Sequence, residues 1–118
     1  MNTLLLPARL RPYYQAELQA ARAAQARRDM AGAFRHLERA HVLGQRWAVS
    51  HTHTHLLMLR HGLRTRNPRE VLGQLPRIVF GFLGSLVGKV PVGNTGGANV
   101  PAEQKMPIPP DLEMLLNG

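Results

Sequence analysis

The stretch DMAGAFRHLERAHVLGQRWAVSHTHTHLLMLRH, residues 29–61, holds two helical patterns that meet at a glycine. After Asp29, which suits a helix N-cap, apolar and small side chains recur every three or four residues as far as Gly44. A second pattern starts near Arg46 and continues to about residue 66. The spacing therefore predicts two consecutive helices. The buried stripe predicted for the second helix consists of Val49, Thr52, Leu56, Leu59 and Leu63.

The segments on either side extend this helical pattern in both directions. Residues 11–29 are rich in alanine, which favours a first helix. Its predicted stripe consists of Tyr14, Leu18, Ala21 and Gln25. A fourth helix is expected to start at Asn67, which suits an N-cap. Pro68 then takes the first helical position, and Glu70 is the acid of a capping box. We expect Pro76 to kink or split that helix. Its predicted core stripe consists of Val71, Leu72, Leu75, Ile78, Val79, Phe82, Leu83 and Leu86.

These patterns predict an all-α fold, a small antiparallel bundle of about four helices with a Gly/Pro/Asn-rich C-terminal extension. We expect a helical bundle domain over residues 1–89 and an extension over 90–118, packed on the same domain or on a neighbour. Within the extension only PPDLEMLLNG, residues 109–118, predicts a short helix. The segment GNTGGAN, residues 93–99, lacks the Gly-Lys-Ser/Thr of nucleotide-binding loops, which favours a loop with left-handed backbone positions. An ordered wrap and a flexible arm both remain open for the extension.

Composition excludes several classes of function. The chain has 118 residues and no cysteine, so disulfides, thiolate metal sites and cysteine nucleophiles are excluded. The net charge of +8 raises the question of nucleic acid, but the basic residues are spread from Arg9 to Arg77 without an aromatic platform, which disfavours it. The apolar run over 78–87 is too short to span a bilayer, and the first twelve residues lack a secretory apolar region. We therefore expect a cytoplasmic protein.

Histidines are concentrated in the middle of the chain. His51 and His55 are four residues apart and share one helix face, whereas His53 is expected on the other side and His61 toward solvent. On the preceding helix His41 follows Glu38 by three residues.

An antiparallel hairpin turning near Gln45 brings these two pairs to the same level. The expected metal ligands are therefore Glu38, His41, His51 and His55. Glu17, on the inner stripe of the first helix, is a candidate fifth ligand or hydrogen-bond partner of a ligand.

Imidazole nitrogens with a carboxylate suit a divalent transition metal, with zinc first and nickel, copper or iron as other possibilities. One Glu-x-x-His unit is too few for a dinuclear iron centre, and the zinc-hydrolase motif His-Glu-x-x-His is absent from the sequence. Since no nucleophile–base arrangement is evident, we favour metal binding, sensing or buffering over catalysis. The alternative is a helical protein–protein interaction module without metal, which binds a partner or a second copy through its tail or its apolar fourth helix. In that case the histidines are ordinary hydrogen-bonded core and surface residues.

Several segments together resemble a known family. The chain contains, in this order, LERAHVLGQ (37–45), HTHTHLLML (51–59), the Gly/Leu-rich fourth helix, PVGNTGGANV (91–100) and MPIPPDLEMLL (106–116). With these segments in this order, the chain resembles a small bacterial family of uncharacterised helical proteins, a domain of unknown function. The resemblance covers almost the whole chain and implies a compact, mainly helical bacterial protein. It implies no activity and no site residues.

Overall fold

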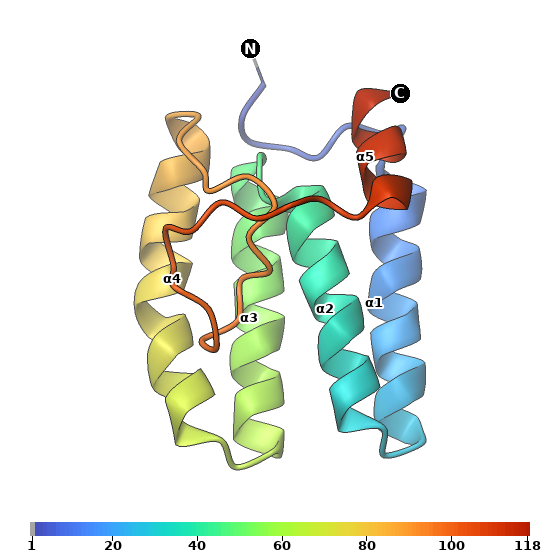
Figure 1. Ribbon diagram of the computed structural model, residues 1–118, viewed down its shortest axis with the longest axis vertical. Helices are drawn as coiled ribbons and strands as arrows, with labels where there is room; N and C mark the ends of the chain where they lie inside the picture. The colour runs from blue at the N-terminus through green and yellow to red at the C-terminus, as the bar shows by residue number, and fades with distance from the viewer. Residues whose placement is uncertain (1) are drawn as a thin grey trace.

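The computed structural model describes residues 2–118 and consists of five α-helices (Figure 1). They are α1 (Arg11–Ala26), α2 (Met30–Gly44), α3 (Ala48–Arg64), α4 (Pro68–Leu86) and α5 (Pro110–Asn117). The described residues contain no strand, so the predicted all-α class is confirmed. None of these helices has the length and apolar character needed to cross a membrane.

Helix boundaries follow the local signals in the sequence. The Asp29 side chain accepts a hydrogen bond from the backbone N–H of Gly32 at 2.9 Å, which caps α2. Asn67 does the same for the N–H of Glu70 at 3.1 Å and caps α4. Pro76 does not split α4, which continues through it from Pro68 to Leu86.

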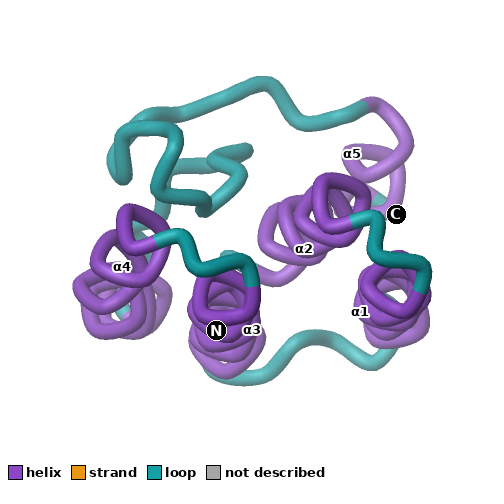
Figure 2. The backbone as a smooth tube through the Cα atoms, turned by 90° about the horizontal axis from the view of Figure 1, so that it is seen from below, coloured by secondary structure: helices purple, strands orange, loops and turns teal. Residues whose placement is uncertain are grey.

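The first four helices lie side by side in chain order, each antiparallel to the one before it (Figure 1). Seen end-on in Figure 2, α1 and α4 are at opposite edges of this row. One apolar cluster joins α1, α2 and α3 through Tyr14, Leu18, Leu37 and Met58. In a second apolar cluster α5 packs against α2, with Leu112 and Leu116 beside Val42 and Leu43.

The segment between α4 and α5 runs back over α2, α3 and α4 (Figures 1 and 2). Gln45 holds it by donating to the carbonyl of Pro91 at 3.1 Å and accepting from the N–H of Gly93 at 2.8 Å. Asn94 is 2% exposed. Gly93 and Gly96 have φ values of +84° and +87°, the left-handed conformation expected for the glycine-rich loop. These contacts make the segment an ordered wrap over the helices.

Most of the apolar residues predicted to be buried in the third and fourth helices are exposed, although Leu59, Val71, Ile78 and Phe82 are partly buried. In α3, Val49 and Leu56 are each 47% exposed and Leu63 is 61% exposed. In α4 the predicted core residues Leu72, Leu75, Val79, Leu83 and Leu86 are also exposed. The buried residues of the two helices are instead mainly polar or small, and they include His51, Thr54, His55, His61, Glu70, Gln74 and Ser85. Most of these polar side chains find hydrogen-bond partners inside, which lets both helices turn their polar sides inward; Nδ1 of His61 is buried without a partner.

Candidate metal centre

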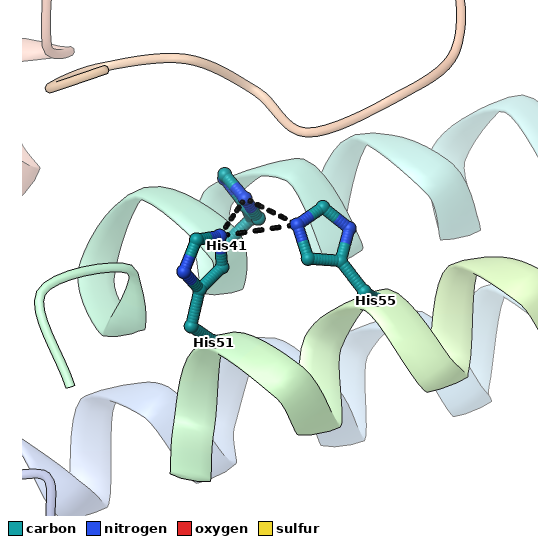
Figure 3. Close-up of side chains that lie close together, drawn as sticks. All are labelled: His41, His51 and His55. Atoms are coloured by element: carbon teal, nitrogen blue, oxygen red, sulfur yellow. Dashed lines mark hydrogen bonds between the residues drawn. The ribbon is translucent and has the colours of Figure 1, made fainter. Parts of the chain in front are cut away.

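Three histidines meet in the space enclosed by α2, α3, α4 and the loop after α4. His41 comes from α2, and His51 and His55 come from successive turns of α3. Their exposed fractions are 1%, 4% and 3%. The Nε2 atom of His41 lies 3.0 Å from that of His51 and 3.2 Å from that of His55, and the remaining pair is 3.1 Å apart (Figure 3). All three rings therefore direct the same nitrogen to one point.

The loop after α4 orients the His41 ring. Nδ1 of His41 lies 2.7 Å from the backbone carbonyl oxygen of Asn94, and a carbonyl oxygen only accepts, so this nitrogen carries the proton. The loop also approaches the ring closely at Gly96, where an added Cβ would stand 2.5 Å from Cδ2 of His41. Nε2 of the neutral ring is then an unprotonated acceptor.

A chain of hydrogen bonds from α4 orients His55. Its Nδ1 lies 2.6 Å from Oε1 of Gln74. The amide nitrogen of Gln74 donates to the Glu70 carboxylate at 2.6 Å and to the carbonyl of Gly96 at 2.9 Å, which fixes the amide with its oxygen toward His55. Nδ1 of His55 is therefore a donor, and its Nε2 is an acceptor.

Ser85 fixes His51 in the same way. The Ser85 hydroxyl donates to the carbonyl of Gln45 at 2.6 Å and accepts from Nδ1 of His51 at 2.8 Å. Gly81, one turn earlier on α4, lets the helix approach, since a Cβ there would stand 3.1 Å from Cε1 of His51. Each of the three rings thus has its Nδ1–H bound to an oxygen.

The consequence is that three unprotonated Nε2 atoms face one another at 3.0–3.2 Å. Lone pairs at this separation repel, and a cation between them removes the repulsion. A triangle with these sides has its corners about 1.8 Å from its centre, so an ion at the usual ~2.0–2.1 Å from each nitrogen fits slightly outside the plane. A divalent ion bound there has three histidine ligands and room for another ligand.

Burial keeps these rings neutral. Desolvation, followed by the charges of the neighbouring histidines, lowers the pKa of His41 well below 6.5. Burial lowers the pKa of His51 to about 3 and that of His55 to about 4. The three nitrogens are therefore available to a metal at neutral pH without losing protons first.

These lowered pKa values predict that the metal-free protein loses stability in mild acid. Between pH 6.5 and about 4 the unfolded chain protonates these histidines and the folded chain does not, so the free energy of unfolding falls as the pH falls. The slope is about 1.4 kcal/mol per pH unit for each histidine that titrates only in the unfolded state. Urea unfolding at several pH values measures it. A free energy of unfolding that stays constant from pH 7 to pH 5 would contradict the prediction.

The other residues expected near the site lie elsewhere. The group whose ligand atoms lie within 4.8 Å of one another consists of His41, His51 and His55, and Glu38 is not part of it. Glu38 is half-buried one turn earlier on α2, where burial and the nearby Glu70 carboxylate raise its pKa. Glu17 accepts from Arg39 at 2.7 Å and lies 3.2 Å from His36, between α1 and α2.

The two other histidines of α3 also lie outside the cluster. His53 lies apart from the cluster and is exposed, with Nδ1 at 3.1 Å from the Tyr14 hydroxyl. The expectation that His61 faces solvent is wrong, since it is 6% exposed and stacks near Phe34 with ring centroids 5.1 Å apart. The buried residues of α3 thus include His61 as well as His51 and His55.

Sequence reasoning missed Gln74, Ser85 and Asn94, the residues that orient the three rings. Gln74, Gly81 and Ser85 share one side of α4 at spacings of seven and four residues, and this polar side is the one that packs inward. A polar stripe on an otherwise apolar helix was the available signal. Asn94 gave none, because it acts through its backbone carbonyl.

Ser85→Ala tests this outer layer of hydrogen bonds. The variant removes the acceptor for Nδ1 of His51, so we expect metal affinity to fall about 10–100-fold. Isothermal titration with Zn²⁺ measures the change. Thr54→Val is the matched control, because that buried hydroxyl bonds to the carbonyl of Ser50 and to Tyr14 and touches none of the three rings. Equal affinities for the two variants would contradict a role for Ser85.

The fold and the cluster together describe a small all-helical protein with a candidate three-histidine metal centre. The chain belongs to the family described as protein of unknown function (DUF3703), whose model matches residues 8–116. This membership confirms the resemblance to an uncharacterised family. Searches of the curated proteins and of the solved structures found no match. Function is therefore inferred from the geometry of the histidine cluster.

Proposed function

We propose that this protein binds one divalent transition metal through His41, His51 and His55. The observation that supports it best is the fixed direction of the three rings, in which every Nδ1–H is bound outward and every Nε2 lone pair points to a common centre. Glu38, the fourth ligand expected from the sequence, stays outside the proposed ligand set. The function proposed is metal binding, sensing or buffering.

Zinc is the first choice of metal. Three neutral imidazoles at these separations suit its short bonds to nitrogen and its tolerance of a low coordination number. Nickel, copper and iron also accept imidazole, and affinity alone ranks copper above zinc. Competition between ions on the same protein decides among them.

The test is metal titration of protein stripped with a chelator. We expect one Zn²⁺ per chain, and at a free metal concentration about 100 times the dissociation constant the folded state gains about 2.7 kcal/mol. Calorimetry gives the stoichiometry, and thermal unfolding gives the stabilisation. Failure of Zn²⁺, Ni²⁺, Cu²⁺ and Co²⁺ alike to bind stoichiometrically or to stabilise the fold would overturn the proposal.

A second candidate function is a helical interaction module without metal. It is favoured by one observation, the exposed apolar side chains of α3 and α4. This function is independent of the histidines and compatible with metal binding, since the exposed apolar residues of α3 and α4 are not among the residues that form the histidine cluster.

A further inference from the structure

The histidine cluster lies at the inner end of a cavity of about 840 Å³. The cavity runs between α4 and the following loop, and its volume is within the ~300–1,000 Å³ typical of small-molecule sites. Pro76 and Phe80 give it apolar walls, while Gly81 and Gly84 add no side chains. A ligand in this cavity can therefore approach a metal held by the three histidines.

The charged residues that line the cavity are mainly basic. Arg77, Lys89 and Lys105 line it together with a single acid, Glu103. Arg77 is held in place by donating to the carbonyls of Gly73 at 2.8 Å and Val100 at 2.9 Å. Such an arrangement attracts anions.

The proposed ligand set strengthens the preference of the cavity for anions. Three neutral imidazoles leave the full double charge of the ion uncompensated, and a buried charge without a counter-charge is costly. The three histidines and the basic side chains line the same cavity, so a further ligand of the metal could come from it.

Building on the proposed function, we propose that the cavity admits a small oxyanion, a carboxylate or a phosphate, which binds the metal through an oxygen atom. The anion supplies the missing ligand and the missing negative charge together. Arg77, Lys89 and Lys105 are then positioning residues for the anion.

Cobalt-loaded protein provides the test, because its visible spectrum reports a change of metal ligand. We expect acetate or inorganic phosphate to change the spectrum with saturation, and the one that binds at the lower concentration identifies the anion class. The double variant Lys89→Glu/Lys105→Glu should bind the anion at least tenfold more weakly while keeping its Co²⁺ affinity. Arg22→Glu/Arg27→Glu, on α1 and at its C-cap, lies at the opposite edge of the helix row, changes the net charge equally and should leave anion binding unaltered.

The outcomes separate the two proposals. Absence of Co²⁺ binding contradicts the metal site itself. Normal Co²⁺ binding with a spectrum that neither anion changes contradicts only the anion proposal. Equal anion binding by the two double variants also contradicts it, since the cavity charges would then play no part.

An independent observation concerns the outer side of the α3–α4 hairpin. Val49, Leu56 and Leu63 of α3 are 47%, 47% and 61% exposed, and they are spaced by seven residues. Helix α4 shows the same spacing in Leu72, Val79 and Leu86, which are 67%, 54% and 38% exposed. Repeats of seven on neighbouring antiparallel helices are typical of one half of a four-helix bundle.

The size of this surface exceeds what a monomer usually exposes. Phe80 lines the cavity and is left out of this surface. The exposed apolar residues on the outer side of α3 and α4 and at the C-terminal cap of α4 are Val49, Leu56, Leu63, Leu72, Leu75, Val79, Leu83, Leu86 and Val87. With roughly 150–200 Å² for each whole side chain, their exposed parts amount to on the order of 800 Å². The largest patch on an ordinary monomer is about 300–600 Å², and each partner in a standard interface buries about 800 Å².

The area and the heptad spacing favour a second copy as the occupant, and the α4 half of the surface lacks the charges that would oppose it, although Arg60 is exposed on the α3 half. The chain carries a net charge of +8, so two copies repel over most of their surface. Between Glu70 and Lys89 the only charged residue is Arg77, which is bound to backbone carbonyls on the cavity side of α4. We infer that two copies associate through their α3–α4 hairpins, each burying the apolar side of the other in a four-helix interface.

Sedimentation equilibrium across the micromolar range tests this inference. We expect the wild-type protein to have twice the 13.1 kDa chain mass. Val79→Glu should be a monomer, because it places a charge in the centre of the apolar stripe. Met114→Glu is the matched control and should remain a dimer, since Met114 is 76% exposed on α5.

Two further measurements distinguish a folded monomeric variant from an unfolded one. The circular dichroism and Zn²⁺ uptake of Val79→Glu show whether the variant folds, because the histidines are on the opposite side of the hairpin. A monomeric wild-type protein contradicts the inference, as does a dimer that Val79→Glu leaves intact. A monomer that binds anionic lipid vesicles through the same surface would show that a membrane occupies it instead.

Discussion

His51→Ala is expected to reduce zinc affinity by more than about 100-fold, beyond the ~10–100-fold cost of losing an outer hydrogen-bond partner. The reason is that His51 supplies one of three converging nitrogens, and two nitrogens from different helices hold an ion far less well than three. The stabilisation that the metal provides should disappear with it. Zinc titration followed by thermal unfolding with and without the ion measures both effects.

His53→Ala is the matched control, two residues away on the same helix. His53 is exposed and contacts the Tyr14 hydroxyl, so its loss should leave zinc affinity within about twofold of wild type. If His53→Ala weakened zinc binding as much as His51→Ala, zinc would be binding to the histidine-rich surface of α3 rather than to the buried cluster.

Local signals were sufficient to predict the helices and most of the cluster. Asp29 and Asn67 cap α2 and α4 through hydrogen bonds to residues three positions later, which is a property of the adjacent sequence alone. The four-residue spacing of His51 and His55 puts them on one face in any helix. His41 follows from hairpin geometry, because a short turn after Gly44 brings the ends of α2 and α3 to the same level.

The rotation of α3 and α4 was not predictable by the same reasoning. Apolar spacing alone places Val49 and Val79 inside, yet both are about half exposed. The buried side is instead determined by hydrogen bonds between residues distant in sequence, such as Ser85 with Gln45 and Gln74 with Gly96. If the exposed stripes meet in a dimer, the sequence pattern reports burial between chains, which a single chain cannot show.

Glu38 shows a second limit of spacing arguments. Its position three residues before His41 is compatible with a shared ligand face, but Glu38 is not part of the group whose ligand atoms lie within 4.8 Å of one another. Partial burial, followed by the charge of Glu70, raises the pKa of Glu38. The acid of this region that does connect to the cluster is Glu70, which holds the Gln74 amide against His55.

Gly96→Ala is expected to destabilise the metal-free protein by about 2–4 kcal/mol and to weaken zinc binding at the same time. Two costs add at this position. The φ of +87° is a conformation that costs an L-residue about 1–2 kcal/mol. The new Cβ would also stand 2.5 Å from Cδ2 of His41, and the ring cannot move without losing its bond to Asn94 or its place beside His51.

Gly88→Ala separates these two costs. Gly88 has a φ of +75°, but no atom lies within 4 Å of the Cβ that alanine would add. The control should therefore show only the backbone cost of about 1–2 kcal/mol and unchanged zinc affinity. Urea unfolding and zinc titration of the two variants give the comparison. Equal destabilisation by the two substitutions, with zinc affinity unchanged in both, would mean that the loop does not hold His41 in place.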